Sequence, residues 1–341
     1  MKKRIFVTTL ALTFFIPLLL YVSISGNHPT NIDLIPQMDY DLTDWDPNFD
    51  VMQDFTPEIV NKMEMFSDRA IFTRNLDSQE LELEEFSEPL FRPFSEDGFY
   101  GTDSSWGSAD LPSISMYDVD SRVIIGSDDR RHITNLQAHP NGYAAVVFLE
   151  VTFPNGVTGT GSGTMVGPTT ILTAGHVLFS LTHGWATSIR VTPGGTQSNF
   201  SSAWATSFST TNGWVNSSAN NPNFDFDYGV IRIGQNLNTG WFGARTETNS
   251  TLNNGTAMVI GFPGDKARGT MWYDTGSISN AATRSFRHFA DTVGGNSGGP
   301  VVLINNWQYV VGIHVAGNQS QQFNLAARVT TDVIDMILNN Q

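Results

Sequence analysis

The chain has 341 residues and a net charge of −15 at pH 7, so it is long enough for one or two domains with sizeable cores. It contains no cysteine, which excludes disulfides, thiolate metal sites and a cysteine nucleophile.

The N-terminus has the pattern of a secretory signal peptide. Three basic residues at positions 2–4 precede an apolar run over residues 5–22, which Pro17 interrupts, and small residues follow. We expect cleavage near Ser25, which assigns residues 1–25 to the signal peptide and predicts a secreted product with no membrane attachment after cleavage. A membrane anchor is the alternative, because the apolar run is nearly long enough to span a bilayer.

The acidic charge belongs to one segment. Residues 26–122 contain 22 acidic and 5 basic residues, a net charge of −17, whereas residues 123–341 contain 11 and 10, a net charge of −1. This division indicates an acidic propeptide over residues 26–122, with a solvated linker as the alternative. Apolar residues spaced as on one helical face predict a helix over residues 57–72. Neither segment contains a basic run, so we expect no nucleic-acid binding.

Residues 123–341 read as an all-β region closed by one helix. Short apolar runs alternate with Gly, Pro and Asn turns, which is typical of a sandwich or barrel. An apolar stripe after Thr331 and Asp332, either of which suits a helix cap, predicts the closing helix. The strands are predicted over residues 143–153, 161–166, 170–173, 188–191, 227–233, 257–261, 276–279, 301–303, 308–314 and 324–328.

One serine lies in a glycine-rich run at residues 291–300, just before the apolar strand at 301–303. Glycines permit backbone conformations that side chains forbid, and they let successive N–H groups converge on one point. A serine nucleophile beside an oxyanion hole has these requirements. Ser297 is therefore a candidate nucleophile if a base and its orienting acid are present.

A histidine and an aspartate lie at the ends of other predicted strands. His176 follows small residues after the strand at 170–173, and Asp227 opens an apolar strand. Asp225 is two residues away and would face the same side of a strand, so periodicity does not separate the two acids. The chain order His, Asp, Ser differs from that of subtilisins and of α/β-hydrolases.

The three segments, LTAGH, DYGVIRI and GGNSGGP, resemble those of trypsin/chymotrypsin-fold serine endopeptidases over about residues 123–341. The resemblance implies two six-stranded antiparallel β-barrels followed by a C-terminal helix. It also implies a triad of Ser297, His176 and Asp227, an oxyanion hole formed by the N–H groups of Gly295 and Ser297, and no cofactor or metal. The expected partners are protein or peptide substrates, and a monomer is expected.

A second resemblance concerns specificity. Thr292, five residues before the serine, and His314 resemble the pair with which glutamyl endopeptidases hold a glutamate side chain before the cleaved bond, the P1 position. Gly317 would keep the pocket mouth open. Asn296 replaces the aspartate that pairs with the freed N-terminal amine elsewhere in the family. We therefore expect Val123, once freed by cleavage after Arg122, to form part of the glutamate site.

Several alternatives remain at this stage. Asp291 next to Thr292 raises the possibility of a pocket for basic residues, with His314 a packed structural residue. A catalytically idle binding homologue and a narrow-specificity toxin-like protease of the same fold are the others. The acidic propeptide is expected to inhibit the enzyme by occupying, or repelling substrate from, a cationic pocket.

Overall fold

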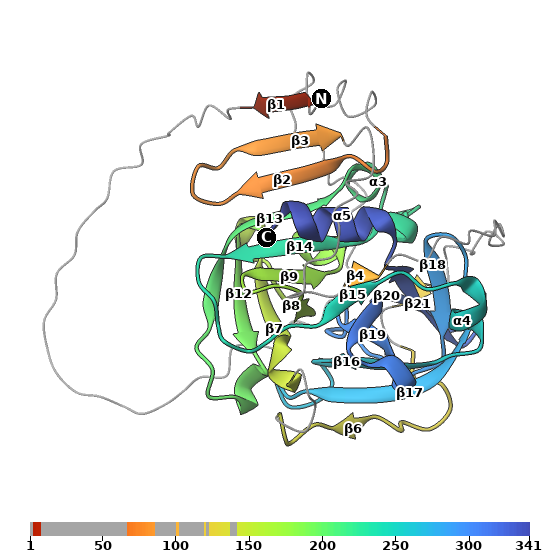
Figure 1. Ribbon diagram of the computed structural model, residues 1–341. Helices are drawn as coiled ribbons and strands as arrows, with labels where there is room; N and C mark the ends of the chain where they lie inside the picture. Colours follow the sequence, from red (N-terminus) through yellow and green to blue (C-terminus); the bar gives the residue numbers. More distant parts are fainter. Residues whose placement is uncertain (1–2, 8–66, 86–99, 102–118, 121–122, 137–141) are drawn as a thin grey trace, which may run out of the picture.

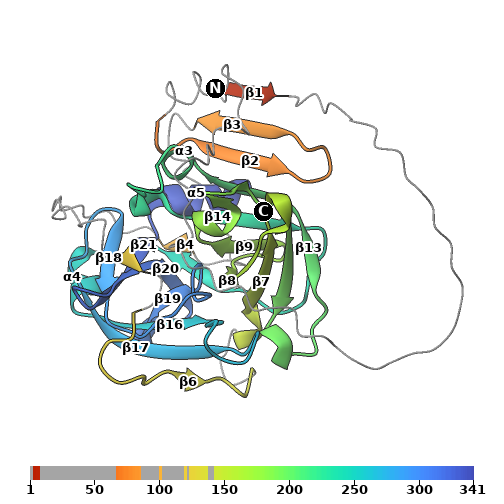
Figure 2. The same cartoon turned by 180° about the vertical axis from the view of Figure 1, so that it is seen from behind.

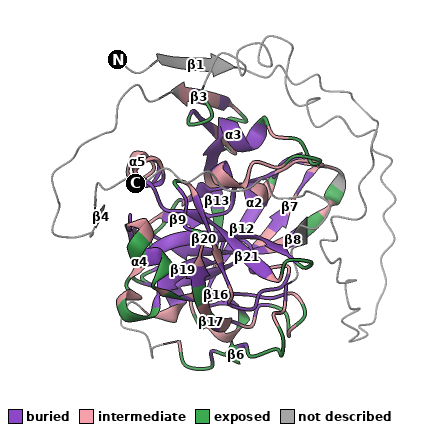
Figure 3. Ribbon diagram, turned by 90° about the vertical axis from the view of Figure 1, so that its right-hand side faces the viewer, coloured by how far each residue is buried: buried purple, intermediate pink, exposed green. Residues whose placement is uncertain are grey.

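The computed structural model describes residues 3–7, 67–85, 100–101, 119–120, 123–136 and 142–341. Most of the predicted signal peptide and of the predicted propeptide lies outside these residues. The described chain forms two barrels packed side by side, green and blue in Figure 1. Their strands are largely buried, as Figure 3 shows.

The first barrel consists of six antiparallel strands in the order β13-β12-β7-β8-β9-β14, and pairing between β13 and β14 closes it. Its interior is filled by aromatic side chains, among them Trp185 and Phe208, whose rings stack 5.7 Å apart. The strands are β7 (Val146–Thr152), β8 (Thr158–Met165), β9 (Thr170–Thr173), β12 (Ser188–Pro193), β13 (Ala203–Thr211) and β14 (Gly229–Ile233).

The second barrel has the order β19-β16-β17-β18-β21-β20 and is closed by pairing between β19 and β20. A separate hydrophobic cluster that includes Phe286 and Ile278 fills part of it, while one larger cluster runs through both barrels. The strands are β16 (Thr256–Gly261), β17 (Trp272–Ser279), β18 (Ser285–His288), β19 (Pro300–Leu303), β20 (Tyr309–Asn318) and β21 (Phe323–Arg328).

Short elements connect the barrel strands, and one longer helix ends the chain. The short strands are β6 (Arg131–His132), β10 (Phe179–Ser180), β11 (Gly184–Trp185) and β15 (Gly243–Arg245). The helices are α2 (Gly175–Leu178), α3 (Asn212–Val215), α4 (Asn249–Asn253) and α5 (Thr331–Asn339). In the described part of the chain, five 3-10 turns cover Tyr143–Ala145, Pro154–Gly156, Gly195–Gln197, Phe224–Phe226 and Ile304–Asn306.

The predicted fold class, two six-stranded barrels with a C-terminal helix, is confirmed. The sequence did not reveal β13 or β18. β13 is rich in Ser and Thr rather than apolar residues, and its buried hydroxyls find hydrogen-bond partners on other segments of the chain. Thr210 Oγ1 donates to the Tyr228 carbonyl at 2.9 Å, and Thr211 Oγ1 donates to the Phe226 carbonyl at 2.6 Å. Hydrophobic alternation is therefore a weak predictor of such a strand.

Part of the predicted propeptide extends the sheet of the first barrel. β2 (Ile71–Asn75) pairs antiparallel with β13 and with β3 (Leu81–Glu85), forming a hairpin above α5, orange in Figure 1 and Figure 2. The helix predicted over residues 57–72 is wrong at its described end, where Ile71 and Phe72 lie in β2. Both side chains are buried, and the Phe72 ring lies 6.4 Å from that of Trp185. Burial against the barrel overrides the helical spacing.

The first 122 residues contribute three more described strands. β1 (Lys3–Val7), within the predicted signal peptide, pairs with β3. β4 (Tyr100–Gly101) runs parallel to β15. β5 (Val119–Asp120) pairs antiparallel with β20 at Gly317 and Asn318.

We expect the hairpin to contribute measurably to the stability of the full chain. Replacing Phe72, which is 1% exposed, by alanine should lower the free energy of unfolding by about 3–5 kcal/mol because it leaves a cavity beside Trp185. Urea denaturation followed by tryptophan fluorescence measures this difference. The matched control is Trp204→Ala on β13, where the side chain is 61% exposed. This variant should change the free energy of unfolding by less than about 0.5 kcal/mol. Equal effects of the two variants would mean that the hairpin is not docked.

Candidate active site

His176 and Asp227 meet at the junction of the two barrels. His176 lies in α2, directly after β9, and Asp227 follows a 3-10 turn that leads into β14. The His176 backbone N–H donates to Asp227 Oδ1 at 2.8 Å, and the ring Nδ1 lies 2.8 Å from Oδ2. The aspartate is fully buried, whereas 29% of the histidine side chain is exposed. The carboxylate therefore favours a proton on Nδ1, which leaves the lone pair of Nε2 available as a base.

Trp214 forms one wall beside the histidine, and sequence patterns gave no sign of it. Its ring centroid lies 6.0 Å from that of His176. Its position is fixed because Nε1 donates to the Phe179 carbonyl at 2.8 Å and its backbone N–H is capped by the Thr211 hydroxyl. The indole limits the orientations that the imidazole can adopt.

The glycine turn that contains Ser297 packs directly against the strand that leads to His176. Gly298 has a φ of +83°, and a Cβ added there would lie 2.1 Å from Thr173 Oγ1 and 2.9 Å from Ala174 N. No other residue fits this backbone without a shift of the first barrel. The Ser297 carbonyl accepts a hydrogen bond from the Ser162 N–H of β8 at 2.8 Å. The turn therefore joins the second barrel to the first at the candidate nucleophile.

Gly295 and Ser297 N–H groups are the predicted oxyanion donors. Gly295 has a φ of +94°. Its carbonyl accepts from the Ser162 hydroxyl at 2.7 Å, and the same hydroxyl accepts from the Phe262 N–H at 3.0 Å. Asn296 is buried, and its side-chain oxygen accepts from the Val293 N–H at 3.2 Å, which closes the turn locally.

Thr292 and Val123, predicted to share a pocket, lie side by side. The Val123 N–H donates to the Thr292 carbonyl at 3.1 Å, and the Thr292 N–H donates to the Val123 carbonyl at 3.2 Å. Asn324 Nδ2 supports the pair by donating to the Val123 carbonyl and, at 2.8 Å, to the Ala290 carbonyl. The Thr292 hydroxyl is buried and has no hydrogen-bond partner among the described residues. A buried hydroxyl without a partner is costly and suits a polar group supplied by a ligand.

His314 lies on β20 against the glycine turn. Its carbonyl accepts from the Gly298 N–H at 2.8 Å, and its N–H donates to the Gly299 carbonyl at 3.0 Å. Gly317 lies farther along the same strand, at the edge where β5 pairs. The structure thus places both residues on the strand beside the glycine turn.

Asp291 binds the segment that follows Val123. Its carboxylate accepts hydrogen bonds from the Ile125 N–H at 2.7 Å and the Asp129 N–H at 3.2 Å. Burial raises the pKa of Asp291, and the neighbouring Asp274 carboxylate raises it further, whereas hydrogen bonds from the two N–H groups lower it. Its role is to fasten the segment after Val123 to the barrel.

A second buried histidine lies behind His314, and sequence reasoning missed it. His288 Nε2 and His314 Nδ1 are 3.2 Å apart, and both side chains are almost completely buried. Burial lowers the pKa of His288 to about 3, and burial with the nearby His288 and His176 lowers the pKa of His314 well below its usual value. Both imidazoles are therefore neutral at pH 7 in the free protein. This revises the expectation of a permanently cationic pocket.

The fold and these motifs define a serine endopeptidase of the trypsin type. The sequence matches the trypsin family over residues 135–337, and the chain belongs to that family.

Within the family it resembles proteases named glutamyl endopeptidases. It is 32% identical to the glutamyl endopeptidase of Bacillus licheniformis over 67% of this chain and 71% of that protein. A solved structure of a Glu endopeptidase in complex with MPD superposes with a TM-score of 0.55 at 28% identity, covering 64% of this chain and 98% of the other. The chain is therefore a glutamyl endopeptidase-like protease of the trypsin fold.

Another relative has a name that points to different chemistry. The chain is 38% identical to a protein named extracellular metalloprotease of Bacillus subtilis, over 63% of this chain and 68% of that protein. In the described part of this chain, no three histidine, aspartate or glutamate side chains gather closely enough to hold a metal ion.

The two buried histidines make stability sensitive to acid. Between pH 6.5 and about 3 the unfolded chain binds a proton at position 288 that the folded chain does not bind, so stability falls as the pH falls through this range. His288→Gln keeps a polar contact with His314 and should reduce that loss by up to about 1.4 kcal/mol per pH unit. Urea denaturation at pH 7, 6, 5 and 4 measures the slope. The same slope in His288→Gln as in the native chain would refute the assignment.

Proposed function

We propose that this chain is a secreted zymogen of a serine endopeptidase that cleaves after glutamate, and after aspartate less well. The predicted triad accounts for hydrolysis. Ser297 Oγ attacks the scissile carbonyl while His176 Nε2 accepts its proton and later returns it to the leaving amine. Asp227 holds the proton on Nδ1 and stabilises the imidazolium that forms. The Gly295 and Ser297 N–H groups stabilise the oxyanion.

The observation that most directly supports glutamate at P1 is the unpartnered Thr292 hydroxyl beside Val123. A glutamate carboxylate would accept a hydrogen bond from this hydroxyl. It would also raise the pKa of His314, so that a proton is taken up with the substrate and the pocket becomes cationic only when occupied. A pocket for lysine or arginine is disfavoured because Asp291 is committed to backbone N–H groups.

Contacts around Val123 and around the preceding strand β5 support synthesis of the enzyme as a zymogen. Val123 already lies against Thr292 in the uncleaved chain, and Val119–Asp120 pair with Gly317 and Asn318 on β20. A substrate that adds to this strand edge as an extended chain would compete with β5. We infer that the propeptide inhibits mainly by covering the edge of β20. Cleavage after Arg122 would free the Val123 amine and uncover that edge.

The N-terminal pattern supports secretion. Residues 1–25 have the features of a signal peptide, and one relative is named as extracellular. Among the described residues, no helix is both long and apolar enough to span a bilayer.

Two substitutions test the catalytic roles. Ser297→Ala and His176→Ala should each lower kcat by at least about 10⁴-fold on a peptide substrate, because nucleophile and base act as a unit. Thermal melting should show both variants folded. The native enzyme should be labelled at Ser297 by an organophosphonate, and the Ser297→Ala variant should not. A native chain that resists labelling would support an idle binding homologue, and substantial activity in either variant would refute the assigned roles.

The Val123 amine is tested by leaving two residues attached to it. An enzyme cut after Asp120, which retains Ser121 and Arg122, should lose at least about tenfold in kcat/KM on a glutamate substrate, because an ammonium–carboxylate contact is removed. The matched glutamine substrate should change much less. The uncleaved chain should be the least active of the three forms. Equal preference for glutamate in the extended and the mature enzyme would exclude a role for the amine.

A further inference from the structure

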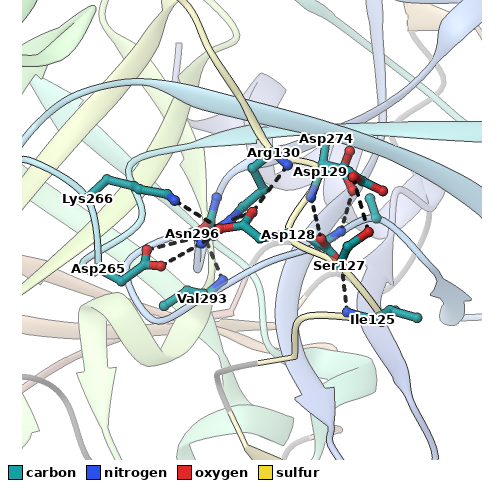
Figure 4. A network of polar contacts seen from close by, with 12 residues as sticks. Ile125, Ser127, Asp128, Asp129, Arg130, Asp265, Lys266, Asp274, Val293 and Asn296 are labelled. Carbon is teal, nitrogen blue, oxygen red and sulfur yellow. Dashed lines mark hydrogen bonds and ion pairs between the residues drawn. The ribbon is translucent and has the colours of Figure 1, made fainter.

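Arg130 is a buried cation seven residues after the predicted new N-terminus, and the mechanism above does not use it. Its side chain is 2% exposed. Nε and Nη2 donate to the two oxygens of Asp128, both at 2.8 Å, and Nη1 and Nη2 donate to the two oxygens of Asp265 at 2.9 and 2.5 Å. Lys266 Nζ lies 2.9 Å from Asp128 and extends the network, as Figure 4 shows. Paired, fork-shaped contacts of this kind fix both direction and distance.

The N-terminal side of this network is fastened to the second barrel. Asp291 accepts the Ile125 and Asp129 N–H groups, and its own N–H donates to Asp274 Oδ2 at 2.7 Å. These contacts use backbone N–H groups and side chains, not the amine of Val123. The segment is therefore held in place although Asn296 stands where an aspartate would pair with that amine.

The other side of the network reaches the predicted oxyanion hole. Asp265 follows Gly264, whose N–H donates to the Gly294 carbonyl at 2.7 Å. In a trans peptide the carbonyl and the following N–H point in opposite directions. Fixing the Gly294 carbonyl therefore fixes the direction of the Gly295 N–H. The fit is close, because a Cβ on Gly295 would lie 2.5 Å from the Phe262 carbonyl oxygen and 3.1 Å from Gly264 N.

From these contacts we infer that Arg130 is a positioning residue for the oxyanion hole. It holds Asp265, and through the adjacent Gly264 it sets the orientation of the peptide between Gly294 and Gly295. The inference rests on the proposed catalytic roles of Gly295 and Ser297. Without the guanidinium, the carboxylates of Asp128 and Asp265 lose the cation between them, and the loop from Phe262 to Lys266 is free to shift. A displacement of about 1 Å at a catalytic donor can lower the rate by roughly 100-fold.

The test compares Arg130→Gln with Arg131→Gln in the mature enzyme. Arg131 is the adjacent arginine and is exposed, so it controls for loss of one positive charge. We expect Arg130→Gln to lower kcat by about 10- to 100-fold, with KM changed by less than about threefold, since substrate contacts remain. The Arg131→Gln variant should match the native enzyme. Asp265→Asn, at a side chain that is 41% exposed, is a milder second variant that should show the same loss of kcat to a smaller extent even if Arg130→Gln folds poorly.

Binding of two ligands distinguishes a positioning role of Arg130 from a purely structural one. A peptidyl boronate forms a tetrahedral adduct that needs the oxyanion hole, whereas a product peptide ending in glutamate needs the P1 pocket. Asp265→Asn and Arg130→Lys should bind the boronate at least about tenfold more weakly while binding the product peptide as the native enzyme does. Parallel weakening of both ligands, or unchanged kcat in all variants, would overturn the inference. Failure of the native enzyme to react with an organophosphonate would instead overturn the proposed function.

Discussion

The close fit of the glycine turn between the two barrels is the constraint on which the site depends. Gly298 occupies a position where a Cβ would collide with Thr173 and with the backbone of Ala174, and the Ser297 carbonyl is held by Ser162. The turn belongs to the second barrel, and the histidine and aspartate belong to the first. Close contact between the two backbones therefore brings the three predicted catalytic residues to one junction.

The segment that begins at Val123 links activation, specificity and catalysis. Its first residue lies against Thr292, and the Asp291 carboxylate accepts hydrogen bonds from the backbone a few residues later. Arg130 then joins the segment to Asp265, in the loop beside Gly295. This arrangement replaces the single ion pair that Asn296 cannot form. It also separates two effects of cleavage: docking of the segment does not require a free amine, whereas recognition of a substrate carboxylate does in our proposal.

The sequence was informative where local patterns determine structure. The turn-separated strands and the apolar stripe of α5 were sufficient to predict an all-β region closed by a helix. The division into two barrels came from the family resemblance that the three motifs carry. The sequence was uninformative where contacts between distant residues determine the local structure. β13 is polar because its hydroxyls are paired inside the barrel, and residues 71–72 form a strand because β13 offers them an edge. The pairing of Arg130 with Asp265, 135 residues away, and the contact between His288 and His314 have no local pattern at all.

The central claim, that this junction cleaves peptide bonds after glutamate, is tested most directly by the bonds that the mature enzyme cuts. A denatured protein mixture is digested with the mature enzyme, and the P1 residues of the products are identified by mass spectrometry. We expect glutamate to dominate at P1, with aspartate a minor class. Dominance of lysine, arginine or aromatic residues at P1 would contradict it.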